Sequence, residues 1–319
     1  MGFIAKRLAI TAITLFLVSI VTFGAFRLIP GDAALLALGI DATEAQIQAL
    51  REEMGLDRSY PARYFSWLQG LFTGNLGYST RFMGVPVSQM ITERLPVTLT
   101  LAALSFILII LISVPVSLFA VKKENSFPCH IINTFTALSI SIPGFFLGVL
   151  LTWIFGIVFR VFVPGAFVPH SENFIFFLGG LFFPALAIAL PNAALVVKFL
   201  RTSVFRELRS DYVRTAKSKG SNSSRILRRH VLKNASLPAI TLLGMITGEI
   251  LAGSVVIERV FGIPGMGMLL LASITARDYI MIETIVVYIA FAVIMANTLA
   301  DIVLRIVDPR ISVTEKYSA

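Results

Sequence analysis

The side chains that carry out most enzyme chemistry are few in this sequence and lie far apart. Its three histidines, His130, His170 and His230, fall in loops or at the ends of apolar segments. There is no His-x-x-x-His pair, no Gly-x-Ser-x-Gly motif and no paired acid cluster within the apolar segments. The single cysteine, Cys129, excludes an intrachain disulfide and a cysteine-cluster metal site. We therefore predict no catalytic residue, no metal site and no cofactor.

The sequence also lacks the loop with which many ATPases hold their nucleotide. No Gly-x-x-x-x-Gly-Lys-Ser/Thr motif occurs, so the chain cannot bind ATP in the usual P-loop manner. If the chain belongs to an energised transporter, the energy must therefore come from another subunit.

One acid, Glu249, stands apart because it lies within an apolar segment. It is about ten residues from either end of 238–259, which at about 1.5 Å per helical residue places it near the middle of a membrane span. A central acid costs about 2.5–3.5 kcal/mol on insertion scales, so such residues usually face a cavity or a partner. Two interpretations stay open: a carboxylate on a translocation pathway, or a protonated or hydrogen-bonded Glu buried between helices. Nearby, Gly244 and Gly248 have the spacing that permits close helix approach.

The composition is that of a membrane protein. Hydrophobic residues make up 56% of the chain and charged residues 14%, against about 25% charged in soluble proteins. A bilayer core of about 30 Å needs roughly 20 apolar residues per helix. Six segments meet this requirement: 8–28, 98–121, 131–159, 175–200, 238–259 and 284–304. We therefore predict an all-α membrane protein with six transmembrane helices.

Basic residues predict how these spans are oriented. The net charge is +9, and Lys and Arg mostly flank the apolar segments, which favours membrane topology over nucleic-acid binding. Ten Lys and Arg lie in 201–233, two more at 122–123, and another pair at 6–7. With six spans these stretches share one side, which the positive-inside rule makes cytoplasmic. The sequence thus predicts a multi-pass membrane protein with both termini cytoplasmic.

The long segment between the first two spans, 29–94, is then extracytoplasmic, and its pattern predicts ordered structure. A helical pattern follows Thr43 and ends at Gly55. A second apolar helical face follows it, made of Tyr64, Trp67, Leu68 and Leu71. Glycines at 74, 77 and 84 then interrupt regular structure.

The basic loop 201–237 contains two helical patterns separated by Gly220. Asp211 is expected to cap the first helix, and Gly220 to end it in the left-handed conformation. The second helix is expected to start near Ser223 or Ser224. On composition alone, the loop is typical of a solvated connector.

The residues of this loop carry a resemblance. The runs DYVRTAKSKG (211–220) and RHVLKNASLP (229–238) resemble the cytoplasmic signature loop of permease subunits in binding-protein-dependent ABC importers, and most nearly the dipeptide, oligopeptide and nickel branch. The family's Glu-Ala-Ala is here Arg214-Thr215-Ala216, whereas Gly220 and Pro238 are retained. Shorter matches follow in order along nearly the whole chain: Pro30-Gly31-Asp32, Gly55-Leu56-Asp57, Gly74-Asn75-Leu76-Gly77, Pro96-Val97-Thr98-Leu99, Arg277-Asp278-Tyr279 and Asp308-Pro309-Arg310-Ile311.

The resemblance implies a type I ABC importer permease fold in the bacterial cytoplasmic (inner) membrane, and a coupling helix that docks on an ATPase. The residues that it assigns to coupling are Asp211, Tyr212, Arg214, Thr215, Ala216, Gly220 and Pro238. We expect Val213 and Ala216 to fill a groove in that partner, and Gly220 and Pro238 to hold the short helix parallel to the membrane. The expected parts of the chain are a first helix (1–28), the external segment (29–94), a permease core (95–305) and a tail (306–319).

The implied partners are one or two ABC ATPase subunits, a second homologous permease in a heterodimer, an extracytoplasmic binding protein and the lipid bilayer, with no nucleic acid. Di- or oligopeptides are the expected cargo, and nickel or a metal chelate is the alternative. An ion-driven secondary transporter is a further alternative, although it usually shows inverted halves with broken helices. A membrane-embedded enzyme would need converging polar groups at one depth, which the histidines do not supply.

Overall fold

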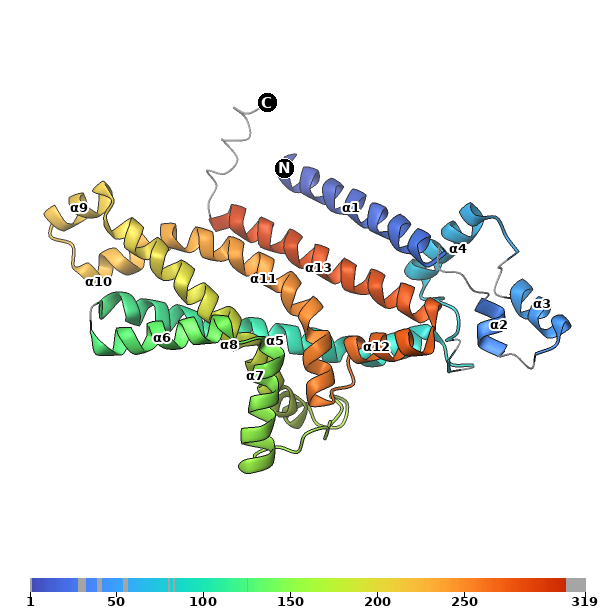
Figure 1. Cartoon of the computed structure of the whole chain (residues 1–319). Coiled ribbons are helices and arrows are strands. Elements are labelled where there is room, and N and C mark those ends of the chain that lie inside the picture. Colours follow the sequence, from blue (N-terminus) through green and yellow to red (C-terminus); the bar gives the residue numbers. More distant parts are fainter. Residues whose placement is uncertain are drawn as a thin grey trace. The chain divides into compact units, whose positions relative to one another are not determined.

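The computed structural model describes residues 2–27, 33–38, 42–53, 57–79, 81–82, 84–124 and 126–307, and helices dominate them (Figure 1). The only β pairing within these ranges is an isolated bridge between Tyr78 and Pro86. The sequence matches Pro30-Gly31-Asp32 and Asp308-Pro309-Arg310-Ile311 lie outside the described residues, as do Gly55, Leu56 and nearly all of the predicted tail 306–319.

Within the described residues, five helices contain apolar stretches that are long enough to cross a membrane. Helix α1 (Gly2–Arg27) is the first, and α5 (Val87–Lys122), α8 (Phe174–Leu208), α11 (Leu232–Phe261) and α13 (Tyr279–Val307) follow. In a bilayer, a helix satisfies all its backbone polar groups internally, which is why apolar stretches of this length fold as helices. Each of the five contains one of the predicted spans.

The remaining predicted span, 131–159, is wrong as one continuous helix. Within this span helix α6 (Phe127–Ser141) ends and helix α7 (Gly144–Leu151) starts. The chain bends by 106° between Phe127–Ser141 and Gly144–Val158. Pro143 causes the break, because proline disfavours helical geometry in the residue before it, and Ile142 is accordingly extended (φ −89°, ψ 123°). Counted as one broken span, the pair brings the total to six.

Helix α7 continues into a π-helical turn, η1 (Thr152–Val158).

The chain forms two compact units. The first comprises Met1–Ala5, Thr100–Ile263 and Met295–Ala319. Helix α8 lies at its centre and packs against α6, α7 and α11. Close approach depends on glycine: a Cβ on Gly244 of α11 would meet the Cβ of Ala300 on α13 at 2.7 Å.

The second unit comprises Lys6–Leu99 and Pro264–Ile294. Its core is formed by the start of α5, α12 (Met266–Ala276) and the start of α13. Asp278, in the sequence match 277–279, is buried and holds this unit together. Its carboxylate accepts hydrogen bonds from the Ser79 hydroxyl and from the backbone N–H of Met281 in α13. The match thus has a structural role, because one buried acid ties the segment between the first two spans to the start of α13.

The segment between the first two spans is helical, as predicted. It contains α2 (Ala33–Leu38), α3 (Glu44–Glu53) and α4 (Tyr60–Thr73). Thr43 caps α3 through reciprocal bonds with Gln46, a Gln variant of the capping box. Gly74 ends α4 in the left-handed conformation (φ +78°).

Candidate functional site

The predicted coupling element is a short helix between two spans. Helix α9 (Asp211–Ser218) ends in a Schellman motif: Ser221 N–H donates to the carbonyl of Ala216 and Gly220 N–H to that of Lys217. Gly220 has φ +78°, a conformation that residues with a Cβ rarely adopt, as the sequence predicted. The start differs from expectation, because Asp211 is the first helical residue and Ser210 occupies the cap position, where no side-chain cap bond forms.

The inner face of α9 packs against other helices of the same chain. Val213 is fully buried, in a cluster contributed by α5, α8, α9, α10 (Ser223–Ile226), η2 (Leu227–Val231) and α11. Ala216 is half-buried and packs against the same cluster. The members of this cluster, which we call the α9 seat, are Val121, Leu200, Val204, Val213, Ile226, Leu227, Val231, Ala235 and Ala239. The expectation that Val213 and Ala216 fill a partner's groove is therefore wrong.

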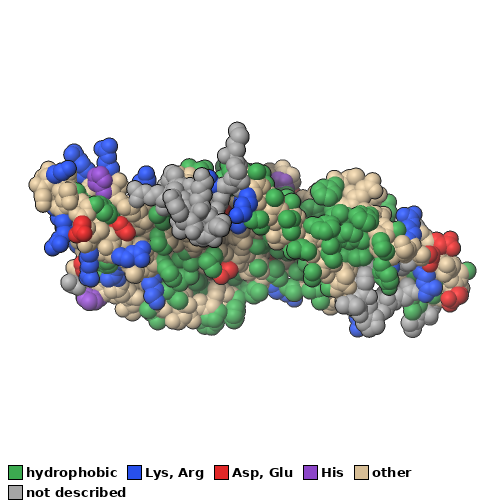
Figure 2. Space-filling model, turned by 90° about the horizontal axis from the view of Figure 1, so that it is seen from above, with side chains coloured by type: hydrophobic (Ala, Val, Ile, Leu, Met, Phe, Trp, Pro, Cys, Tyr) green, Lys and Arg blue, Asp and Glu red, His purple; other side chains and the backbone are tan. Residues whose placement is uncertain are grey.

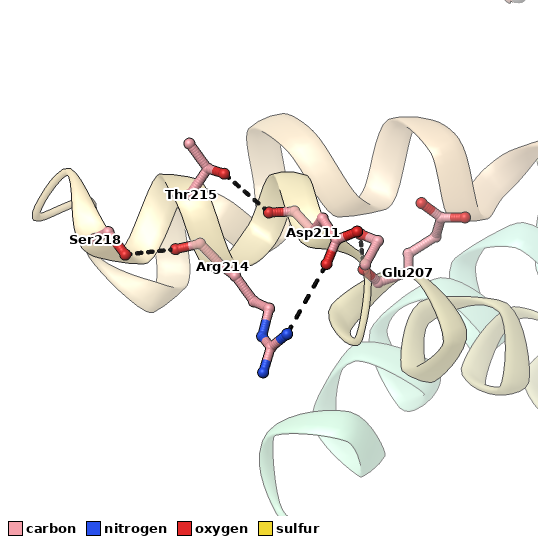
Figure 3. Close-up of polar contacts among 6 residues, drawn as sticks. Glu207, Asp211, Arg214, Thr215 and Ser218 are labelled. Atoms are coloured by element: carbon pink, nitrogen blue, oxygen red, sulfur yellow. Dashed lines mark hydrogen bonds and ion pairs between the residues drawn. The ribbon is translucent and has the colours of Figure 1, made fainter.

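The outer face of α9 is polar and exposed. Asp211, Arg214, Thr215 and Ser218 recur at helical spacing and are all exposed, and Figure 3 shows the polar contacts among them. The hydroxyls of Thr215 and Ser218 donate back to the carbonyls of Asp211 and Arg214, both at 3.1 Å. Asp211 and Arg214 form an ion pair of 4.0 Å with fully and largely exposed side chains, so it contributes little to stability. In the part of the chain that the structure describes, nothing covers this face, so another protein can contact it.

A hydrogen bond fixes the entry to α9. The hydroxyl of Tyr212 donates to the carboxylate of Glu207, at the end of α8, at 2.8 Å. Burial raises the pKa of Tyr212 above its usual value, and the bond to Glu207 raises it further. Tyr212 therefore stays neutral at physiological pH and links α9 to α8.

The chain that leaves α9 forms the long helix of the fifth span directly. Asn222 caps it, because its side-chain oxygen accepts from Ser224 N–H at 3.0 Å, and this places the start where the sequence predicted. The residues Ser224–Phe261 then run as one helix through α10, η2 and α11. Pro238 lies inside α11 and is half-buried. It therefore lies within this helix and not at the edge of α9, and its part in coupling stays a prediction.

Lys and Arg surround α9 and dominate this end of the molecule, as the side chains coloured blue around α9 and α10 show (Figure 2). The exposed basic residues of this surface are Arg214, Lys217, Lys219, Arg225, Arg228, Arg229 and Lys233. Because Asp211 is the one acid in 211–233, the surface is suited to a partner with acidic groups.

Glu249 is exposed on the surface of α11. It belongs to an exposed stripe with Thr241, Met245, Ala252 and Val256, whereas Ile246 and Ile250 on the opposite side are buried. The interpretation that Glu249 is buried between helices of this chain is wrong. A carboxylate at the middle of a span is costly against acyl chains, and such residues usually face a cavity or a partner.

A polar groove of about 480 Å³ lies between α6 and α8. Arg201 donates to the side-chain oxygen of Asn133 across it, and its guanidinium lies 5.4 Å from the ring centre of Phe205. Lys198 and the hydroxyls of Thr136 and Ser141 also line the groove.

Comparison with known proteins identifies the family to which this chain belongs. Residues 113–313 match the family model described as the inner membrane component of binding-protein-dependent transport systems, and residues 1–102 match the model of its N-terminal part. The chain belongs to this family.

The permease is similar over its full length to proteins named as peptide permeases. It is 35% identical to a putative peptide permease protein of Brucella ovis, over 97% of this chain and 98% of the relative. It is 33% identical to a probable peptide ABC transporter permease protein of Sinorhizobium fredii, with the same coverage. It is 32% identical to the oligopeptide transport system permease protein AppB of Bacillus subtilis, over 97% of this chain and 99% of the relative. Membership makes the chain a multi-pass protein of the inner membrane that works with a binding protein.

Sequence reasoning missed two structural residues of this permease. Val213 was assigned to a partner because an amphipathic helix shows which face is apolar but not what covers it. Asn222 was overlooked as a cap, although its position two residues before Ser224 is a recognised signal.

Proposed function

We propose that this permease is one half of the membrane channel of an ATP-driven importer for di- and oligopeptides. ATP is hydrolysed on one or two partner ATPase subunits, which dock on α9 from the cytoplasm, where both termini of the permease also lie. A second, homologous permease completes the channel, and an extracytoplasmic binding protein delivers the peptide. The observation that carries the proposal is the two-sided construction of α9, with a buried apolar inner face and an exposed polar outer face.

The seat explains how α9 transmits movement. A force on its outer face reaches Val213, which packs in the same cluster as residues of α5, α8 and α11. These three helices include three of the spans. Close-packed interiors are poorly compressible, so displacement of α9 moves the ends of these spans with it. The Tyr212–Glu207 hydrogen bond adds a second link to α8.

Polar groups on the surface of the first unit support a channel wall. Glu249 is exposed within the fifth span, and the α6–α8 groove exposes Lys198 and hydroxyl groups. Such groups inside a bilayer usually line a water-filled cavity or face a protein partner. In the channel, Glu249 offers a carboxylate to the ammonium group of a passing peptide.

The peptide cargo rests on the relatives, since those compared above are named as peptide or oligopeptide permeases. The test is reconstitution of the permease with the second permease, the ATPase subunits and the binding protein. Labelled tripeptide is supplied with ATP, with a non-hydrolysable analogue, or with an ionophore that removes ion gradients.

We expect accumulation that requires ATP hydrolysis and is insensitive to the ionophore. Uptake that follows an ion gradient without ATP would refute the ATP-driven importer. Uptake of a nickel chelate but of no peptide would refute peptides as the cargo and leave the ATP-driven mechanism intact.

A further inference from the structure

Helix α4 packs against the side of α1, at residues that lie before the carboxyl end of α1. Tyr64 of α4 is buried, and its hydroxyl forms a hydrogen bond of 2.8 Å with that of Ser19. The Tyr64 ring meets the rings of Phe16 and Phe23 edge-on, with centroids 6.4 and 5.4 Å apart. Trp67, one turn further along α4, lies 5.6 Å from Phe23. The contacts therefore extend over about two turns of the carboxyl-terminal part of α1.

The position of these contacts sets the depth of α4 in the bilayer. The apolar stretch of α1 has 23 residues, Ile4–Phe26, or about 35 Å at about 1.5 Å per residue. The hydrocarbon core is about 30 Å thick, so at most about 5 Å of α1 lies outside it. Even if this excess is all at the carboxyl end, the core begins near Phe23, and Ser19 lies about 6 Å inside it. Tyr64 thus reaches into the core.

One flank of α4, about a quarter-turn around the helix from Tyr64, is apolar and exposed. Phe65 is 64% exposed and Phe72 is 85% exposed, and residues seven apart share one helix face. Phe65 follows directly on Tyr64, whose depth is set by α1. The side of α1 that faces away from α4 is also apolar and exposed at this level, with Leu17 at 55% and Val21 at 68%. The two exposed surfaces belong to the same compact unit.

We infer that α4 is an interfacial membrane helix, embedded in the leaflet at the carboxyl end of α1, with Phe65 and Phe72 among the acyl chains. Lipid is the occupant because the exposed face lies at the depth of a span that itself presents apolar side chains to lipid. The segment 29–94 is therefore not wholly in water, and α4 attaches it to the bilayer surface. This inference rests on α1 as a membrane span and holds whatever the permease transports.

The test measures the surroundings of single side chains by spin-label accessibility. The one cysteine, Cys129, is buried, and Cys129→Ser provides the background. Phe65→Cys and Phe72→Cys each carry a nitroxide in the full chain, reconstituted in vesicles of phosphatidylethanolamine and phosphatidylglycerol. Val21→Cys on α1 is the lipid reference, and Glu52→Cys, an exposed residue of α3, is the water reference. Both substituted phenylalanines are exposed, so folding should tolerate the change.

We expect the ratio of oxygen to nickel-chelate accessibility at both positions to approach that of Val21→Cys and to exceed that of Glu52→Cys several-fold. A ratio equal to that of Glu52→Cys would place α4 in water and overturn the inference. Shielding from both reagents would show that a protein covers this face, and would overturn it as well. The same labels in the complex with the second permease and the binding protein should keep the lipid signature.

Discussion

Truncation of Val213 to alanine tests whether the seat holds α9. Val213 is 0% exposed, and loss of two methyl groups at about 0.8 kcal/mol each weakens the docked state by about 1.6 kcal/mol. A cavity that stays open adds to this cost. A helix of eight residues is not stable alone in water, so docking on the seat is what keeps it folded. Because about 1.4 kcal/mol is a factor of ten, the undocked population should rise at least tenfold.

Two measurements follow from that shift. Amide hydrogen exchange in 212–221 should be faster in Val213→Ala, and reconstituted complexes should hydrolyse more ATP for each peptide imported. Ser218→Ala is the matched control, because Ser218 is exposed on the same helix and its hydroxyl bonds only to the helix's own backbone among the described contacts. Unchanged exchange and an unchanged ATP-to-peptide ratio in an assembled Val213→Ala complex would refute the role of the seat.

Three further predictions concern other contacts. Gly244→Ala should destabilise the fold by about 1–3 kcal/mol, because the new Cβ would lie 2.7 Å from that of Ala300. Adding Ala300→Gly to this variant should restore the melting temperature. Failure to restore it would refute the close approach of α11 and α13. Glu249→Gln should lower peptide uptake several-fold while the complex assembles and hydrolyses ATP normally, whereas unchanged uptake would exclude a charged role on the pathway. The pKa of Tyr212 is raised by burial and by Glu207, so its hydrogen bond stabilises the fold below about pH 10 and is lost as the pH rises through the raised pKa. Alkaline melts should therefore show a steeper loss of stability in wild type than in Tyr212→Phe, and parallel curves would contradict this.

Much of the fold is predictable from local patterns in the sequence. Apolar stretches predict the five long helices because the bilayer demands length and internal hydrogen bonding. Gly220 is predictable as a helix end because its left-handed geometry follows from residue type alone. The bend at Pro143 is also a local signal, but the apolar run around it is long enough to hide the break.

What each helix faces was not predictable. Val213 could equally have covered a partner or the chain's own core, and the outcome depends on Leu200 and Val204, which no local pattern connects to it. The exposure of Glu249 depends on which sides of α11 are covered by other helices. The apolar helical pattern that includes Tyr64 would be the same whether α4 packed against α1 or elsewhere. The sequence alone therefore did not reveal that α4 lies against α1.

The central claim, that the outer face of α9 receives the ATPase, is tested most directly by photocrosslinking. A benzophenone side chain is placed at Thr215 or at Ser218 in the assembled, ATP-hydrolysing complex, with Ile13, exposed on α1, as the control position. The account predicts adducts with an ATPase subunit from both α9 positions and none from Ile13. An active complex in which neither α9 position crosslinks to an ATPase subunit would contradict it.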